Sequence, residues 1–335
     1  MRINYFRGDA KDALSLAPSN FFDAGLTDPP YALRFRGERW DYKLPEVAIW
    51  EEHLRVLCPG AYMLVYGAAR THHRLAVSLE DAGFILVDVL FYLYGNGLPK
   101  GQSIGAAADK LLQGRPRKDR DEPETMHGAL WDGYASQLKP AYEAVILVRK
   151  PPEESNAINA IMHGTGGLNI SGSLIGGSRF PANVQLDEAA AEQLDLQAGE
   201  RKSGSRKAGV RKGLGYGGGA GDGGPAIEGS TGGASRFFYT SKASRGERDA
   251  GLDKPNPHKT VKPLDLSTHY AKLLLPPKRE GKERHLLNCY SGSGTETIAA
   301  FLAGWEHVIS IDNDPANEPL LFARAKHWLG VDLLR

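Results

Sequence analysis

The sequence HLLNCYSGSGTETIAAFLAG, residues 285–304, decides the fold of this chain. Its apolar first part, 285–289, predicts a strand, and the turn that follows carries Gly292 and Gly294. An apolar run at helical spacing comes next and ends at Gly304. A strand, a glycine turn and a helix in this order are typical of an α/β sheet that binds a nucleotide, because the glycines let a ligand approach the backbone.

The next apolar run ends in Asp312, which lies 18 residues after Gly294. At this distance an acidic side chain meets the ribose hydroxyls in nucleotide-binding sheets. Thr297 stands where the dinucleotide fingerprint has its third glycine, so a bound adenosine without a pyrophosphate is favoured over NAD. The alternative is a turn that only tightens the joint between a strand and a helix.

A second motif, Asp28-Pro29-Pro30-Tyr31, follows the apolar run 21–27. Two prolines fix φ and remove two donors, so this loop is rigid and its carbonyls face outward. The Asp28 carboxylate, the Pro29 carbonyl and the Tyr31 ring suit a flipped-out base that carries an NH2 group. Two acceptors can pull such an amine toward sp3 geometry, and its nitrogen can then attack a methyl group held in line. The alternative is a proline-rich loop after a buried strand.

A third motif is PHKTVKPL, residues 257–264. The helix that begins at Pro263 can bind the carboxylate of an amino-acid tail at its N-terminus, or it is an ordinary helix start in a basic linker. Residues 201–262 hold 13 Lys/Arg against 5 Asp/Glu, and this local excess of positive charge is where we expect a polyanion to be held.

The composition excludes several classes of protein. With 335 residues and a net charge of +1, the chain is long enough for one large α/β domain or two smaller ones and is no polycation. Its two cysteines, Cys58 and Cys289, form no CxxC pair, so we expect neither a zinc site nor a disulfide framework, and no metal ligand set is predicted. The sequence shows neither a signal peptide nor an apolar run of about 18 residues, so we expect a cytoplasmic protein without a membrane span.

The three motifs, in this order, resemble those of DNA amino-methyltransferases that use S-adenosylmethionine. A catalytic loop that precedes the cofactor turn is similar to the β-class arrangement, a circular permutation of the usual order. Other segments resemble those of phage and prophage members, so the resemblance covers nearly the whole chain except the glycine run. These segments are 59–60, 94–97, 139–143, 163–166, 179–183 and 235–239.

The resemblance implies an α/β fold with a doubly wound, mostly parallel seven-stranded methyltransferase sheet, circularly permuted, with a loop-rich target-recognition insertion. Alternating strand and helix patterns over 1–150, including a helix from Pro45 to Gly60, agree with such a sheet. The opening strand, 2–9, is then the cofactor-domain strand displaced to the N-terminus. The predicted parts are a catalytic half (1–94 and 141–150), an insertion (95–140), a target-recognition region (151–260) and a cofactor-binding half (261–335). Glycine fills 13 of the 33 positions of 203–235, which predicts disorder there.

The resemblance also assigns roles to residues. It implies four catalytic residues: Asp28, Pro29, Pro30 and Tyr31. It implies these cofactor-binding residues: Asp9, Thr260, Lys262, Pro263, Tyr290, Ser291, Gly292, Ser293, Gly294, Thr295, Asp312 and Asn313. Two positions depart from the family pattern, since Asn288 replaces the usual Asp before the turn and Asp312 replaces the more usual Glu. Both changes predict weaker binding of the cofactor.

The expected activity is methyl transfer from S-adenosyl-L-methionine to the exocyclic N6 of a flipped-out adenine in double-stranded DNA. Asp28 favours adenine because cytosine-N4 members more often carry Ser at that position. The alternatives are a cytosine-N4 enzyme, an RNA methyltransferase served by the basic glycine-rich segment, and a DNA-binding protein that has lost catalysis. The sequence leaves open whether the protein forms a homodimer and whether it works beside a cognate restriction enzyme.

Overall fold

The computed structural model describes residues 2–34, 37–97, 101–116, 121–205, 228–242, 245–258 and 260–330. The chain divides into two compact units. The larger consists of Met1–Leu93 and Glu143–Arg335, and the smaller is Tyr94–Tyr142. Among the described residues, no helix combines the length and the apolar character needed to cross a lipid bilayer.

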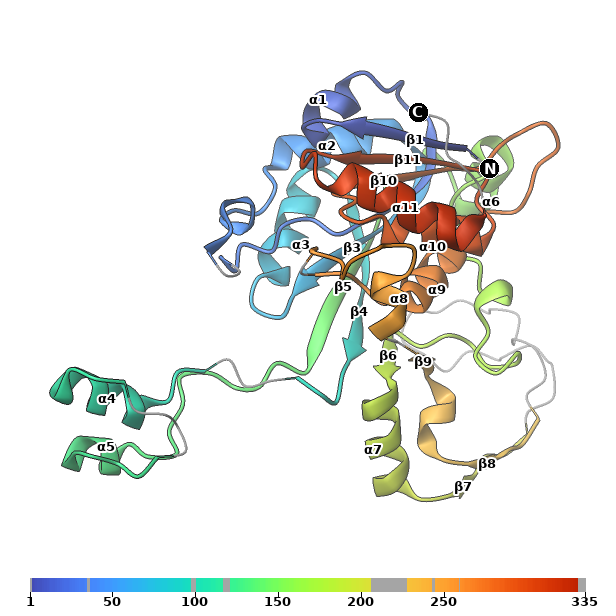
Figure 1. Cartoon of the computed structure of the whole chain (residues 1–335). Coiled ribbons are helices and arrows are strands. Elements are labelled where there is room, and N and C mark those ends of the chain that lie inside the picture. Colours follow the sequence, from blue (N-terminus) through green and yellow to red (C-terminus); the bar gives the residue numbers. More distant parts are fainter. Residues whose placement is uncertain are drawn as a thin grey trace. The chain divides into compact units, whose positions relative to one another are not determined.

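The larger unit is built on a mixed, mostly parallel sheet of nine strands (Figure 1). The strand order is β1-β11-β10-β2-β3-β5-β4-β6-β9. The strands are β1 (Arg2–Arg7), β2 (Phe22–Thr27), β3 (Leu57–Ala68), β4 (Ile85–Leu93), β5 (Tyr142–Arg149), β6 (Val184–Asp187), β9 (Tyr239–Ser241), β10 (His285–Cys289) and β11 (His307–Asp312). The pair β3–β5 is antiparallel, whereas β1–β11, β11–β10, β10–β2, β2–β3, β4–β6 and β6–β9 are parallel.

The sheet has nine strands where seven were predicted. The additional strands β6 and β9 have only four and three residues, too few to show an alternating pattern. Both come from the segment predicted as a loop-rich target-recognition region. They therefore extend the sheet beyond β4, so this segment is partly ordered by strand pairing.

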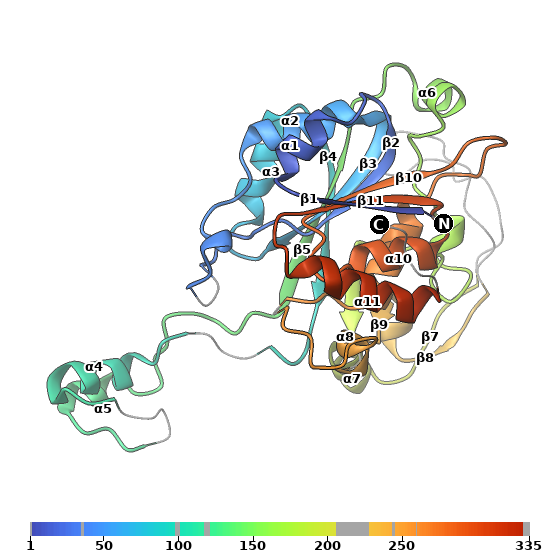
Figure 2. The same ribbon diagram turned by 45° about the horizontal axis from the view of Figure 1, so that its top comes forward.

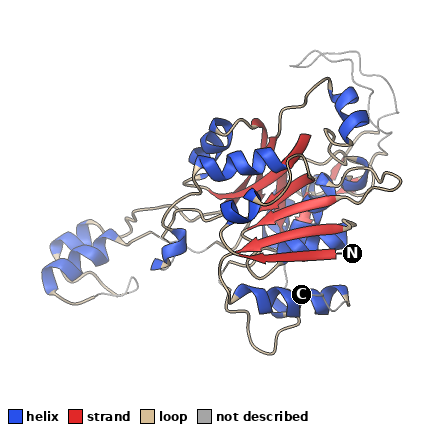
Figure 3. Ribbon diagram, turned by 90° about the horizontal axis from the view of Figure 1, so that it is seen from above, coloured by secondary structure: helices blue, strands red, loops and turns tan. Residues whose placement is uncertain are grey.

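Helices cover both faces of the sheet (Figures 2 and 3). One layer contains α1 (Ala10–Ser15), α2 (Val47–Val56) and α3 (His72–Asp81), and the other contains α9 (Leu264–Leu274), α10 (Thr295–Ala303) and α11 (Asn317–Leu329). The first layer packs Leu14, Trp50 and Leu79 into the main core cluster against strand residues such as Met63. Strand β2 is buried at all six positions, as expected for a central strand with helices on both faces.

Further helices connect the strands of the larger unit or flank them. They are η2 (Arg39–Asp41), α6 (Asn156–His163), η3 (Ser171–Ser173), α7 (Glu188–Ala198), η4 (Ala234–Phe237) and α8 (Arg245–Asp249). A small ribbon pairs β7 (Arg201–Lys202) with β8 (Thr231–Gly232). Strand β8 lies inside 203–235, so the predicted disorder does not extend to that end of the segment, whereas 206–227 lie outside the described residues.

The smaller unit contains α4 (Ile104–Gln113) and α5 (Met126–Leu130). Asp109 of α4 is buried and accepts hydrogen bonds from the backbone N–H and the hydroxyl of Thr125, which caps α5. The N–H of Tyr94, the first residue of the unit, donates to the carbonyl of Ala141, the last residue but one, at 3.0 Å. The two ends of this unit are therefore adjacent.

Candidate functional site

The two motifs predicted to carry the chemistry lie side by side. Strands β2 and β10 are parallel neighbours, so the Asp28 loop (28–31) and the glycine turn (290–294) leave the same edge of the sheet. The Thr27 hydroxyl donates to the carbonyl of Cys289 at 2.6 Å and so joins the last residues of the two strands. Ligands of open α/β sheets bind at this carboxyl edge.

The backbone of the Asp28 loop is held by the buried carboxylate of Asp41. Asp41 accepts hydrogen bonds from the backbone N–H of Tyr31 at 2.7 Å and from that of Leu33 at 3.1 Å. The Thr71 hydroxyl donates to the carbonyl of Tyr31 at 2.8 Å. These contacts fix the backbone after the two prolines, so the loop is rigid for reasons beyond its proline content.

A single buried ammonium group organises the side chains of this loop. Lys262 is 6% exposed, and its Nζ donates to Tyr31 Oη at 2.7 Å and to Glu143 Oε1 at 3.0 Å. The Tyr31 hydroxyl in turn donates to Asp28 Oδ1 at 2.6 Å, and Lys262 Nζ lies 3.3 Å from the same oxygen. The Tyr66 ring also lies under this ammonium, 5.0 Å away. Lys262 was predicted to bind the cofactor tail, yet its ammonium lies with the Asp28 loop.

The electrostatics of this cluster follow from burial. Burial raises the pKa of Asp28 above its ordinary value, although Lys262 opposes the rise. Burial would lower the pKa of Lys262, but Asp28 and Glu143 reverse this and raise it. Burial, together with the Asp28 and Glu143 carboxylates, raises the pKa of Tyr31. The lysine is therefore charged and the tyrosine neutral at physiological pH.

Glu296 is a second buried carboxyl group near Asp28. Burial and the charge of Asp28 raise its pKa to about 7. It accepts a hydrogen bond from Ser267 Oγ at 3.3 Å, and Ser267 is also bonded to Tyr66 Oη at 2.9 Å. These hydrogen bonds link Glu296, in the first turn of α10, through Ser267 to Tyr66, whose ring lies beside the Lys262 ammonium.

The glycine turn has the backbone conformation that the motif predicts. Gly292 and Gly294 have φ of 49° and 85°, and Tyr290 also has a positive φ, 58°. A Cβ added to Gly292 would lie 2.9 Å from His258 Nε2, so the turn and this ring pack directly against each other. Leu321 closes the space beside Gly294 in the same way.

The second half of the turn is held by a buried arginine. Arg324 of α11 is fully buried and donates from Nη1 to the carbonyl and hydroxyl of Ser293 at 2.8 and 3.0 Å and to Thr295 Oγ1 at 3.0 Å. Burial lowers the pKa of its guanidinium. No local pattern in the sequence indicates this contact, because Arg324 belongs to a separate helix.

Asp312 and Asp9, which were expected to face the cofactor, are bonded within the protein. Asp312 is buried and accepts from the N–H of Gly292 at 2.7 Å and that of Asp314 at 2.9 Å, and from the amide of Asn317 at 3.0 Å. A carboxylate has about four lone-pair sites, so three are used. Asp9 caps α1 by accepting from the N–H of Lys11 at 2.8 Å.

The remaining predicted cofactor residues differ in burial. Asn313 is exposed, Thr260 and Pro263 are half-buried, and Ser291 is buried with no partner for its hydroxyl among the described residues. His258 Nδ1 is likewise buried without a described partner. Two unpartnered polar atoms at one glycine turn indicate a place where a polar ligand satisfies them.

Asn288, the departure from the family pattern, faces the interior. It is fully buried, and with its oxygen on Thr297 Oγ1 (2.9 Å), its nitrogen lies within hydrogen-bond distance of the carbonyls of Leu26 (3.1 Å) and Cys289 (3.2 Å). The amide therefore joins β10, β2 and α10. All of these contacts are made within the protein.

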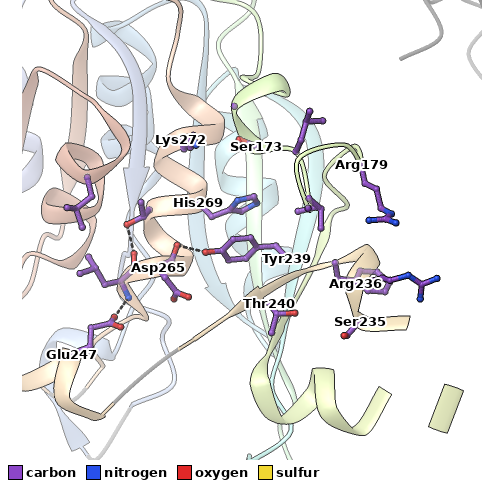
Figure 4. A pocket seen from close by; sticks show the side chains of 18 of the residues that line it. Ser173, Arg179, Ser235, Arg236, Tyr239, Thr240, Glu247, Asp265, His269 and Lys272 are labelled. Carbon is purple, nitrogen blue, oxygen red and sulfur yellow. Dashed lines mark hydrogen bonds between the residues drawn. The ribbon is translucent and has the colours of Figure 1, made fainter. Parts of the chain in front are cut away.

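One cavity is lined by no residue of the Asp28 loop. It has a volume of about 800 Å³ and is lined by parts of α9, η4, β9 and residues 172–179 (Figure 4). Tyr239 and His269 stack on its wall with ring centroids 3.9 Å apart. Two of its charged groups are bonded within the protein, since Asp265 accepts from Ser241 and Arg236 donates to the carbonyl of Arg201. It therefore shows no convergent set of reactive groups among the residues that the structure describes.

No protein-family model and no curated protein sequence matches the chain. Among solved structures it is similar to the PvuII DNA methyltransferase (cytosine-N4-specific), with a TM-score of 0.50 and 12% identity over 99% of this chain and 95% of that one. It is also similar to the M1.HpyAVI–SAM complex (TM-score 0.44, 13% identity, 95% and 98% covered). A DNA modification methylase of Thermus thermophilus in complex with S-adenosyl-L-methionine gives a TM-score of 0.45 and 13% identity, with 100% and 99% covered. The PvuII likeness shows that the chain has the fold of that enzyme.

Proposed function

We propose that this chain is a DNA methyltransferase that transfers a methyl group from S-adenosyl-L-methionine to N6 of adenine. The observation that carries the proposal is the Thr27–Cys289 hydrogen bond, because it places the Asp28 loop beside the glycine turn at one edge of the sheet. A base-binding loop and a cofactor turn must be neighbours for direct transfer. The fold shared with the PvuII methyltransferase supports this proposal.

The residues at the glycine turn fit the cofactor. The buried hydroxyl of Ser291 and Nδ1 of His258 can bond the carboxylate of its amino-acid part, and the remaining lone pair of Asp312 can accept from a ribose hydroxyl. When bound, S-adenosylmethionine supplies an electrophilic methyl group. Asp9, at the end of β1 beside Gly8 (whose N–H bonds the Asp312 carbonyl), is at the same edge of the sheet.

The Asp28 loop would act on the base. The Asp28 carboxylate accepts a hydrogen bond from the exocyclic amine and, because burial raises its pKa, it is a better acceptor for the proton that the amine loses. Lys262 keeps this carboxylate in place through Tyr31, and it also pairs with the half-buried carboxylate of Glu143. The Tyr31 ring supplies the flat surface on which the base stacks.

The order of the motifs supports a β-class, permuted organisation. The N-terminal strand β1 pairs in parallel with β11, next to the strand that carries the glycine turn. The smaller unit, 94–142, and residues 151–260 would then provide target recognition on double-stranded DNA. The basic excess over 201–262 supports the placement of the phosphate backbone in this region.

The test is methyl transfer with identification of the product. The purified protein is incubated with labelled S-adenosylmethionine and unmethylated duplex DNA, and the DNA is digested to nucleosides. We expect label in N6-methyladenosine, with loss of label but retained cofactor binding in Asp28→Ala. Label in N4-methylcytosine would assign the activity instead to the second candidate, cytosine-N4 methylation. Label in neither nucleoside, or full turnover by Asp28→Ala, would overturn the proposal.

A further inference from the structure

A second cluster of reactive side chains lies at the end of the sheet opposite the Asp28 loop, where strands β10 and β11 begin. Strands β10 and β11 pair in parallel with His285 in register with His307, so both imidazoles stand on one face of the sheet. Their ring centroids are 4.9 Å apart. Glu283, two residues before His285, completes the group. These residues lie at the amino ends of the strands, whereas the Asp28 loop and the glycine turn lie at the carboxyl ends.

The three side chains have the spacing of a metal ligand set. One ligand atom of each lies within 4.8 Å of those of the other two. Nitrogen ligands at about 2.0–2.1 Å from a tetrahedral Zn²⁺ are roughly 3.3 Å apart, so a small closure of the cluster is sufficient. The Glu283 side chain can move toward the two imidazoles, because it is 48% exposed and its ion pair with Arg2, at 3.5 Å, is weak.

The hydrogen bonds around the imidazoles leave one nitrogen ready to coordinate. His307 Nε2 lies 3.3 Å from Asn4 Oδ1, an acceptor, and this contact is a hydrogen bond in the tautomer that carries the proton on Nε2. His307 is 5% exposed, and its Nδ1 is buried with no partner among the described residues. A histidine that binds a metal usually donates its other N–H to an oxygen in this way. On His285, the Asp23 carboxylate lies 3.9 Å from Nδ1 and can orient that ring.

We propose that Glu283, His285 and His307 form a binding site for a late first-row divalent cation, with Zn²⁺ as the best match. Two imidazoles and one carboxylate are ligands that Zn²⁺ prefers, and a water completes the tetrahedron. The bound ion ties β10 to β11 and stabilises the folded state by mass action. The inference does not depend on the proposed methyl transfer, which uses the other edge of the sheet.

The experiment is a titration of metal-free protein with Zn²⁺ by calorimetry, with thermal unfolding as a second readout. We expect one Zn²⁺ per chain and a rise in Tm at saturation. His285→Ala and Glu283→Gln should each weaken binding by about tenfold or more, and Co²⁺ should give visible absorption bands only when this site is intact. The matched control is His73→Ala, which removes an exposed histidine beside His72 and should bind Zn²⁺ like the wild type.

Two results would overturn the proposal. One is wild-type protein that binds Zn²⁺ no more tightly than His285→Ala does. The other is unchanged affinity in Glu283→Gln, a variant that keeps the fold because Glu283 is exposed. Neither result bears on methylation, since a methyl-transfer assay in the absence of Zn²⁺ tests that activity separately.

Discussion

At the scale of single residues, Lys262 is the centre of the proposed active site, because one buried ammonium bonds Tyr31 and Glu143 and faces Asp28. Removing one partner of a buried ion pair costs about 3–5 kcal/mol, since the remaining charge is left unpaired. Lys262→Met should therefore lower the free energy of unfolding by about 3 kcal/mol, and methyl transfer should be lost. Urea unfolding and a product assay measure both effects.

The control for this variant is Lys272→Met, an exposed lysine of α9, which should change neither quantity. Calorimetry with S-adenosylmethionine separates the two roles of Lys262. If its ammonium positions Asp28, as the contacts indicate, cofactor affinity is kept while transfer is lost. A large loss of affinity together with unchanged kcat would instead place its ammonium on the cofactor tail.

Asn288 gives a prediction that opposes the family pattern. Asn288→Asp introduces the residue that is usual in the methyltransferases that the sequence resembles, yet it directs a buried carboxylate at the carbonyls of Leu26 and Cys289. The unpaired acceptor should destabilise the fold by about 1–3 kcal/mol. Thermal unfolding measures this, with the exposed Asn313→Asp as the control. A variant as stable as the wild type would show that the interior accommodates the charge.

The residues of the site could be predicted from the sequence only where the signal is local. Asp28 and Tyr31 lie within one short motif, and the glycine turn lies within another. Glu143 and Glu296 reach the same cluster from distant positions, and no spacing rule connects them with Asp28. The His285–His307 pair was missed for a similar reason, since strand register, which the sequence does not show, makes them neighbours.

At the scale of elements, Gly292 tests the glycine turn. Gly292→Ala places a methyl group 2.9 Å from His258 Nε2 at a φ of 49°, so both the turn and the ring must shift. We expect cofactor affinity to fall by tenfold or more, about 1.4 kcal/mol, as measured by calorimetry. Gly114→Ala is the matched control, because Gly114 has φ of 73° with open space around it and lies outside the site. Equal affinity in both variants would remove the turn from the binding site.

Most strands and helices were predicted from apolar runs, but the exact bounds of a helix and the role of a single glycine were not. The helix predicted from Pro45 to Gly60 is α2, which begins at Val47 and ends at Val56, and Gly60 lies inside β3. Gly60 has φ of 74°, and a Cβ there would lie 2.3 Å from the Asn159 amide, so this glycine serves a close contact with α6 rather than a helix end. A sequence pattern cannot distinguish these two uses of glycine.

At the scale of the whole molecule, the two ends of the smaller unit lie next to each other in space. Because the N–H of Tyr94 bonds the carbonyl of Ala141, a short Gly-Ser turn can replace residues 95–140 without opening the sheet. We expect this variant to unfold cooperatively and to bind S-adenosylmethionine normally but to methylate no DNA, because the proposed target-recognition contacts are gone. Circular dichroism, calorimetry and the product assay check these expectations, and retained DNA methylation would place recognition elsewhere.

The pH dependence of stability reports several buried groups together. Burial lowers the pKa of His53 and His269 to about 4, so between their ordinary value of 6.5 and pH 4 the unfolded chain binds more protons and stability falls with acidification. Glu296 acts in the opposite direction, because its raised pKa of about 7 lets the folded state bind a proton that the unfolded state binds only near pH 4.5.

Replacing Glu296 with Gln removes the group that offsets the histidines. We therefore expect a steeper loss of stability between pH 6.5 and 4.5 in Glu296→Gln than in the wild type, as measured by urea unfolding at several pH values. The exposed Glu200→Gln should leave the slope unchanged. A slope that becomes shallower in Glu296→Gln would contradict the assigned pKa shift.

The hydrogen bond between Thr27 and Cys289 spans 262 residues of sequence, and this determines when the protein can fold. On the ribosome, β1 and β2 emerge long before their partners β11 and β10, which lie more than 250 residues further along the chain. At about 5–20 residues per second, the amino-terminal strands wait for roughly 15–60 s with unpaired edges. A nascent chain therefore has no complete site during this interval, and the apolar edge of β2 that later pairs with β10 stays open.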